Sequence, residues 1–372
     1  MRVAGIMSGT SLDGIDVAIV DIAGQKIRPV AFASTPYPKD VREALHAVSN
    51  THCHTAEISR LHFLLPEIYA DAFHELCRSS GFGRDTVKLI GCHGQTIFHE
   101  GDPVRICGRK IASTLQIGDG SVLAELTGIP VVSDFRTRDM AAGGKGAPLV
   151  PFFDWVYFRH ATRNRVCLNI GGIGNITWLP AGAKQNDVIA FDTGPGNMVM
   201  DQLVAHFTRG RKTFDESGRV AARGHVDRAL VARLLRDRFY RAAPPKSAGR
   251  EQYGKDFIER LLATGLPFED LVATAGAFTV ATIVAGIELL KATPDDLIVG
   301  GGGAHNPQIM GLLAAYLPHT KVSVTTDHGI DSDAKEAIAF ALMAHETWRG
   351  RPSNVPSATG ARHAVVLGKI SR

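Results

Sequence analysis

The sequence predicts an α/β protein built from two similar halves. The chain has 372 residues, which is too long for one ordinary hydrophobic core. In addition, one pattern occurs near the start of each half: a strand, a turn of glycines and polar residues, and a returning strand, at 3–22 and again at 166–179. This weak internal duplication favours two related α/β halves that face each other.

Composition indicates a globular, water-soluble protein. Apolar residues make up 45% and charged residues 21% of the chain, and the net charge is only +4. No basic run is interleaved with aromatic residues, so we expect no nucleic-acid partner. The five cysteines are scattered without a C-x-x-C pair, which favours reduced thiols in a cytoplasm over disulfides or structural zinc.

Two segments bear on membranes. Asp13 and Asp16 interrupt the apolar run that a signal peptide requires. The stretch 272–290 is almost long enough to span a bilayer, but it is rich in Ala, Thr and Gly and contains Glu288. We therefore expect a buried helix there and no membrane association.

The first turn, within 6–16, favours phosphate binding. Gly9 and Gly14 permit backbone angles that let amides face an anion, and Ser8, Thr10 and Ser11 add hydroxyl donors. A plain polar hairpin turn explains the same residues equally well.

The loop lacks the lysine of a Walker motif, and a strand follows it instead of a helix. Phosphate charge would then have to be met elsewhere. Asp13 and Asp16 favour a divalent metal, because Mg²⁺ is held by one or two carboxylates together with the phosphates.

The elements after the opening hairpin follow from hydrophobic periodicity and from glycine and proline breakers. In the first half we expect a helix at 55–77, a strand at 87–90 that presents 91–96 at its carboxyl end, a strand at 114–117, a strand at 129–132, and a crossover into the second domain at 141–148. In the second half we expect strands at 166–170, 176–179, 189–191 and 297–299, helices at 198–207, 226–241 and from about 332, a helix capped by Asn306, and a short edge strand at 364–367.

Asp192 is the strongest candidate for a general base. It ends a strand and opens the turn Asp192-Thr193-Gly194-Pro195-Gly196-Asn197. The alternative is a helix N-cap. We favour the base, because two glycines and a proline impose more backbone control than a cap requires.

The four-glycine turn 300–303, between a strand and a helix, is suited to close approach of a phosphate or a flat ligand. Neither it nor 171–174 matches the dinucleotide fingerprint, so a hydride-transfer enzyme is not expected.

Three further side chains each allow two interpretations. Arg136 could orient an anion or form a salt bridge. Glu336 follows Asp333 by three residues, which also fits a capping box. His93, flanked by glycine at a strand end, fits a structural histidine as well as a functional one.

Taken together, the motifs resemble the actin-like ATPase fold and, within it, the anhydro-N-acetylmuramic acid kinase family. The motifs that carry the resemblance cover nearly the whole chain: 5–16, 91–96, 115–119, 134–136, 146–151, 169–173, 192–197 and 245–247.

The resemblance implies two actin-like (ribonuclease H-like) α/β domains that flank a central nucleotide and substrate cleft. The first would span 1–137, with the tail 350–372 packing back on it, and the second 138–349. It also implies ATP and Mg²⁺ as cofactors, a cytoplasmic location, and a homodimer.

The implied reaction opens the 1,6-anhydro ring of anhydro-N-acetylmuramic acid with water and phosphorylates O6, giving N-acetylmuramic acid 6-phosphate for cell-wall recycling. Asp192 would be the catalytic base. His93, Gln95, Thr96, Arg136 and Glu336 would bind the sugar, and Asp13 or Asp16 the metal. Nucleotide contacts would come from Ser8, Gly9, Thr10, Ser11, Asp13, Gly14, Asp16, Gly171, Gly172, Asn175, Gly301, Gly302 and Gly303.

One position departs from the family pattern. Lys145 stands where the family usually has Gln. The positive charge of this lysine would either help to bind an anionic group of the substrate or have no role in binding. Two other functions stay open: a kinase of the same fold that acts on a free hydroxyl, and a non-catalytic actin-like protein.

Overall fold

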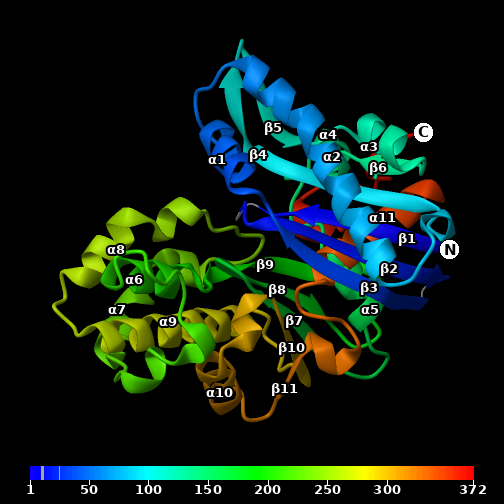
Figure 1. Ribbon diagram of the computed structural model, residues 1–372. Helices are drawn as coiled ribbons and strands as arrows, with labels where there is room; N and C mark the ends of the chain where they lie inside the picture. Colours follow the sequence, from blue (N-terminus) through cyan, green and yellow to red (C-terminus); the bar gives the residue numbers. More distant parts are fainter. Residues whose placement is uncertain (10–11, 25) are drawn as a thin grey trace. The chain divides into compact units, whose positions relative to one another are not determined.

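The computed structural model describes residues 1–9, 12–24 and 26–372, and these form two compact units (Figure 1). The first unit contains 1–157 and 334–372, and the second contains 158–333. Both units combine a mixed β-sheet with helices, which confirms the predicted α/β class and the two-part organisation.

The sheet of the first unit has the order β12-β6-β4-β1-β2-β3, and β5 pairs with β4. Strands β1, β2 and β3 are antiparallel neighbours, whereas β1, β4 and β6 run parallel. The strands are β1 (Arg2–Ser8), β2 (Gly14–Ala23), β3 (Lys26–Pro36), β4 (Leu89–Ile106), β5 (Arg109–Ile117), β6 (Val131–Ser133) and β12 (Lys369–Ser371).

Helix α11 covers the middle of this sheet, in contact with β1, β2 and β4. Two glycines allow the close approach: a Cβ on Gly5 would lie 1.8 Å from the Ala337 carbonyl oxygen, and one on Gly91 2.4 Å from that of Phe340. The helices of this unit are α1 (Lys39–Val48), α2 (Thr55–Ser79), α3 (Gly120–Thr127), α4 (Phe135–Ala141), α5 (Pro151–Phe158), α11 (Lys335–Trp348) and α12 (Pro356–Thr359).

The sheet of the second unit has the order β11-β10-β7-β8-β9. Strands β7, β8 and β9 are antiparallel neighbours, and β7, β10 and β11 run parallel, which repeats the β6-β4-β1-β2-β3 arrangement of the first unit. The predicted duplication is therefore a duplication of topology. The strands are β7 (Arg165–Ile170), β8 (Ile173–Leu179), β9 (Ile189–Pro195), β10 (Asp296–Gly300) and β11 (Lys321–Val324).

The long apolar segment of the second unit is helix α9 (Phe268–Glu288), which packs on β8 and β9. It is long and apolar enough to cross a membrane, but 78% of its apolar 18-residue stretch is buried inside the protein. The prediction of a buried helix is confirmed. The other helices of the unit are α6 (Met198–Phe207), α7 (Arg228–Leu234), α8 (Lys255–Leu262) and α10 (Pro307–Tyr316), with short 3₁₀ helices that include η5 (Arg238–Arg241), η6 (Arg250–Tyr253) and η7 (Gly302–His305).

Several boundaries differ from the prediction. Strand β4 continues through 91–96 to Ile106, and β9 continues through Asp192 to Pro195, because neighbouring strands go on pairing with them. The predicted 226–241 helix is interrupted between α7 and η5, and the edge strand of the tail is 369–371.

The two units also divide the chain after 157 and 333, whereas the expected domains ended at 137 and 349. Helix α11 belongs with the first unit because it packs on that unit's sheet, and 141–148 lies inside the same unit.

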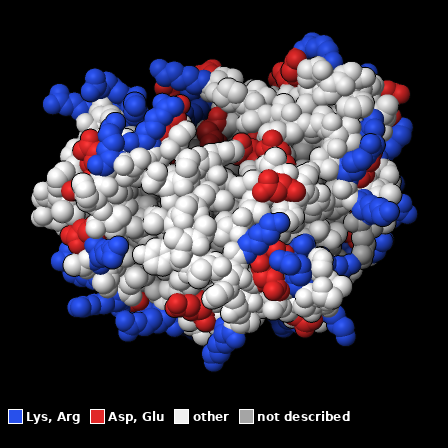
Figure 2. Space-filling model, turned by 90° about the horizontal axis from the view of Figure 1, so that it is seen from below, with Lys and Arg blue, Asp and Glu red and all other residues white. Residues whose placement is uncertain are grey.

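Figure 2 shows that basic and acidic side chains are interspersed on the face in view.

Candidate functional site

A row of polar residues crosses the sheet of the second unit. Gly300 on β10 pairs with Asn169 on β7, Asn169 with Asn175 on β8, and Asn175 with Asp192 on β9. Residues directly opposite each other on neighbouring strands point to the same face of a sheet. Two amides and a carboxylate, from three neighbouring strands, therefore share one face.

Three glycine-containing turns meet at the end of this row. The amide of Asn197 donates to the carbonyl of Gly171, and that of Gly196 to the carbonyl of Gly172, both at 2.8 Å. Gly301 has a left-handed φ of 77°, and a Cβ there would lie 2.6 Å from the Asn169 side-chain oxygen. At Gly303 a Cβ would lie 2.3 Å from Ile170. Side chains are thus excluded at 301 and 303, just after β10, at the edge where parallel sheets bind ligands.

Asp192 lies within β9, and the N-cap of α6 is Asn197, so the N-cap interpretation of Asp192 is wrong. One carboxylate oxygen, Oδ2, accepts a 2.8 Å hydrogen bond from the amide of Ala248. Among the described residues no hydrogen bond reaches Oδ1. Burial raises the pKa of Asp192 to about 6, although Ala248 and the charge of Lys246 act in the opposite direction. A carboxylate with such a pKa suits general base catalysis near neutral pH.

In the first unit, β1 and β2 form the predicted hairpin. Gly14 is required for packing, because a Cβ would lie 2.5 Å from the Thr35 carbonyl oxygen. Among the described residues of the turn, the one with a left-handed backbone is instead Leu12, with a φ of 58°. Ser8 is buried, and its hydroxyl contacts the Gly94 carbonyl and the Tyr69 hydroxyl at 3.0 Å each. Thr10 and Ser11, two of the predicted hydroxyl donors, lie outside the described residues.

Gln95 ties this turn to β4. Its side chain is fully buried, its Nε2 donates to the Gly9 carbonyl at 2.9 Å, and its Oε1 accepts from the Tyr37 hydroxyl at 3.3 Å. The neighbouring Thr96 is half-buried and accepts a 3.2 Å hydrogen bond from Gln116.

His93 and Arg136 form the polar centre of the first unit. The Nε of Arg136 donates to His93 Nε2 at 3.0 Å, and Nη1 of Arg136 donates to the Gly146 carbonyl at 2.8 Å. Because His93 Nε2 accepts, Nδ1 must carry the proton that it donates to the Gly94 carbonyl at 2.7 Å. Burial holds the pKa of His93 well below its usual value, and Arg136 lowers it further.

Glu336 is half-buried in the first turn of α11. Burial raises its pKa, and the positive charges of Arg136 and Lys335 partly offset this rise. The N-cap of α11 is Ala334 and no side chain caps the helix, so the predicted capping box is absent from this end of α11.

The candidate metal ligands lie on the opening hairpin. Asp13 is exposed in the turn, and Asp16 is half-buried on β2 opposite Met7. The described residues contain no group of three or more potential metal ligands. Two carboxylates nevertheless fit Mg²⁺, which usually completes its octahedron with water and phosphate oxygens.

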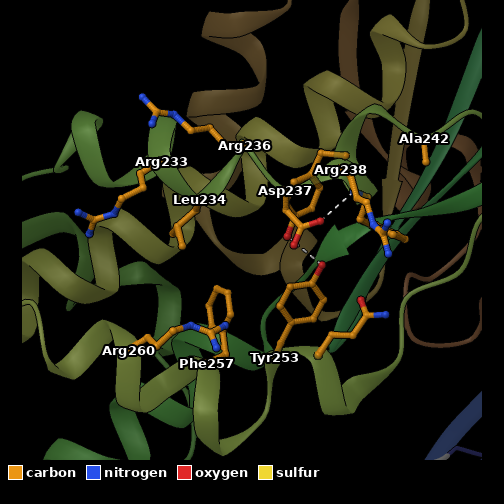
Figure 3. A pocket seen from close by; sticks show the side chains of 12 residues that line it. Arg233, Leu234, Arg236, Asp237, Arg238, Ala242, Tyr253, Phe257 and Arg260 are labelled. Atoms are coloured by element: carbon orange, nitrogen blue, oxygen red, sulfur yellow. Dashed lines mark hydrogen bonds between the residues drawn. The ribbon is translucent and has the colours of Figure 1, made fainter.

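A cavity of about 930 Å³ lies elsewhere in the second unit and contains none of the predicted site residues. Leu234, Tyr253 and Phe257 are part of its lining, while Arg233 and Arg236 at its edge extend in different directions (Figure 3). Its cationic groups therefore do not converge on one point, as an anion site would require.

Sequence reasoning missed three features of the site. In the sequence Asn169 is only one member of a motif. In the structure it pairs with Asn175, which in turn pairs with Asp192, so all three lie in the polar row across the sheet. The loop with Lys246 and Ala248 contacts Asp192, and its motif Pro245-Lys246-Ser247 was the available signal. Lys145 forms a 2.8 Å ion pair with Asp102 at the surface of the first unit, a partner that the sequence did not predict.

Two units of one topology, with glycine turns and a half-buried carboxylate along one sheet, define the duplicated α/β class to which actin-like kinases belong. The family model for anhydro-N-acetylmuramic acid kinase matches residues 1–372. The chain belongs to this family and is a kinase, as predicted.

Curated relatives agree over nearly full length. The anhydro-N-acetylmuramic acid kinase of Caldanaerobacter subterraneus subsp. tengcongensis is 44% identical over 99% of this chain and 96% of its own. The enzyme of the same name from Salinibacter ruber is 42% identical, also over 99% and 96%. Among solved structures, the 2-hydroxyisocaproyl-CoA dehydratase activator of Clostridium difficile aligns over 94% of this chain and 96% of its own, with 13% identity and a TM-score of 0.46.

Proposed function

We propose that this kinase uses ATP and Mg²⁺ to convert 1,6-anhydro-N-acetylmuramic acid into N-acetylmuramic acid 6-phosphate, as a step of peptidoglycan recycling in the cytoplasm. Water forms a bond to C1 of the sugar while the C1–O6 bond breaks. O6 takes the γ-phosphoryl group of ATP, and ADP leaves. The observation that carries this proposal is the half-buried Asp192 carboxylate, which has one oxygen held by Ala248.

Asp192 takes the proton of the attacking water. The base must be ionised before the reaction and able to accept a proton during it, which a pKa of about 6 supports. Water is a poor nucleophile at neutral pH, whereas phosphoryl transfer itself depends mainly on positioning and charge neutralisation. A single well-held base is therefore the group that this reaction needs most.

Arg136 and Glu336 are proposed to contact the sugar and its lactyl carboxylate. Arg136 keeps its charge, because burial lowers its pKa only to about 10. We assign His93 and Gln95 the task of holding Arg136 and the opening turn, since their polar side-chain atoms are already bonded to protein groups. Thr96, which lies on β4 with His93 and Gln95, is proposed to contact the substrate.

The nucleotide is proposed to contact the opening turn through Ser8, Gly9, Gly14 and the predicted donors Thr10 and Ser11, and the second unit through Gly171, Gly172, Asn175 and 301–303. Asp13 and Asp16 would hold Mg²⁺. The ion, when bound, neutralises charge on the β- and γ-phosphates. We also propose that the enzyme is a homodimer.

The test is turnover of ATP and anhydro-N-acetylmuramic acid in ¹⁸O-water, followed by mass spectrometry. We expect one ¹⁸O atom at the anomeric hydroxyl of the 6-phosphate product, no label in its phosphate, and no product when EDTA is present. An unlabelled phosphorylated sugar would instead indicate a kinase that acts on a free hydroxyl. Absence of any ATP-dependent product from folded protein would contradict the proposal outright.

A further inference from the structure

In the part of the chain that the structure describes, the ammonium group of Lys246 is hydrogen-bonded to neutral groups alone. Its Nζ donates to the carbonyl of Phe239 at 2.9 Å and is 3.4 Å from that of Tyr240, both in η5. It also lies 4.7 Å from the ring centre of Phe239 and 5.6 Å from that of Phe191. No carboxylate forms an ion pair with Lys246 among the described residues, so its charge is directed at carbonyls and aromatic faces.

The 3₁₀ helix that receives these bonds is itself firmly held. The hydroxyls of Tyr240 and Tyr253 are 3.0 Å apart, and the Tyr240 ring packs edge-on against Phe278 of α9. Figure 3 shows Tyr253 among the side chains that line the cavity, and the dashed line at its hydroxyl marks the hydrogen bond with Tyr240. Lys246 is therefore tied to a buried part of the second unit.

The other end of the Lys246 segment meets Asp192. The amide of Asp192 donates to the Lys246 carbonyl at 3.2 Å, and the amide of Ala248 donates to Asp192 Oδ2 at 2.8 Å. Segment 244–249 thus lies along β9, the edge strand of its sheet, at the position of the candidate base. The Lys246 side chain joins this segment to η5 through its contacts with the Phe239 and Tyr240 carbonyls.

We propose that Lys246 is a positioning residue for Asp192: it fixes the 244–249 loop so that the Ala248 amide occupies one carboxylate oxygen and leaves the other to receive the proton from water. This inference rests on the proposed role of Asp192 as the base. It assigns to the Pro245-Lys246-Ser247 motif a function that does not require contact with substrate.

Electrostatics supports the same role. The titratable groups whose charges act on or respond to Asp192 are Lys246, from the loop, and Tyr253, from η6. Burial raises the pKa of Tyr253 to about 12, so it stays neutral during turnover. Lys246 is then the one cation among the described residues that lowers the pKa of Asp192, and its removal will raise that pKa.

The test compares Lys246→Met with Lys246→Arg and with Lys255→Met. Methionine keeps most of the apolar stem but removes the donors and the charge, whereas arginine retains both. Lys255 is an exposed lysine of the same unit that pairs with Glu259 at 3.7 Å, so its variant controls for loss of a positive charge. The kcat and KM are measured from about pH 5 to about pH 9, a range that brackets the pKa expected of the base.

For Lys246→Met we expect kcat at neutral pH to fall about 10- to 100-fold, as a misplaced catalytic group predicts. The acid limb, that is, the fall of kcat toward low pH, should move to higher pH, and the KM for ATP should stay unchanged. Lys246→Arg should restore the limb and most of kcat, and Lys255→Met should match wild type.

The proposal is overturned if folded Lys246→Met keeps the wild-type kcat and acid limb. If that variant does not fold, Ala248→Pro tests the same link, because proline has no amide hydrogen for Oδ2; an unmoved acid limb would again overturn it. Asp192→Asn distinguishes failure of the two proposals. If this variant keeps wild-type activity, Asp192 is not the base. If it loses activity while the Lys246 variants behave like wild type, Asp192 is the base but Lys246 does not position it.

Discussion

At the scale of single residues, hydrogen bonding decides what a polar side chain can do. His93 accepts from Arg136 at one nitrogen and donates to the Gly94 carbonyl at the other, so a second ring proton would break the contact with Arg136. Its pKa is held well below the usual range by burial. His93 therefore orients Arg136 and is unsuited to proton transfer near neutral pH.

This arrangement makes stability depend on pH. His93 stays neutral in the folded protein and becomes protonated in the unfolded chain below about pH 6.5, so acidification stabilises the unfolded state. The variant His93→Gln keeps an acceptor for Arg136 but cannot be protonated in the unfolded chain. We expect its free energy of unfolding to decrease by roughly 1–2 kcal/mol less than that of wild type between about pH 7.5 and about pH 5. Urea titrations at both pH values measure it, and an unchanged difference would refute a neutral, buried His93.

At the scale of elements, glycines determine how closely a helix approaches a sheet. Helix α11 places Glu336 in its first turn, and its backbone reaches the sheet at Gly5 and Gly91 because neither has a Cβ. The sequence shows both glycines but not the reason for them. Only the folded chain brings 337–341 against residue 5.

We expect Gly5→Ala to lower the free energy of unfolding by about 1–3 kcal/mol, and kcat as well, because the added methyl must push α11 and Glu336 away from the sheet. Gly311→Ala in α10 is the matched control. It meets nothing within 4 Å, and it should stabilise the helix by about 0.5–1 kcal/mol without affecting kcat. Equal stability of the two variants would show that the α11 contact is not tight.

At the scale of the whole molecule, local patterns predicted the repeated strand-turn-strand units well, because periodicity and glycine turns act over a few residues. Residues 198–207 and the Asn306 cap were predicted to the residue. Pairing across the sheet is not a local property. It extended β9 through Asp192, aligned Asp192 with Asn175 and Asn169, and brought 244–249 onto the edge strand.

The limits of the two units differ from the expected domains for a similar reason. Helix α11 follows the second unit in the sequence but packs on the sheet of the first, a contact that no sequence pattern encodes. Site residues that depend on such distant contacts, Lys246 and Ala248 among them, could be suspected from a motif but not assigned a role.

The central claim is that Asp192 is the base that activates water, and the pH dependence of kcat for wild type and Asp192→Asn tests it most directly. We expect wild-type kcat to rise with an apparent pKa near 6, since burial raises the pKa of Asp192 to that value and only the carboxylate can accept a proton. The asparagine side chain of the variant has the shape but not the basicity, so kcat should fall by about 10²- to 10⁴-fold and the acid limb should vanish, with KM for ATP unchanged. A folded variant that retains wild-type kcat and the same acid limb would contradict the account.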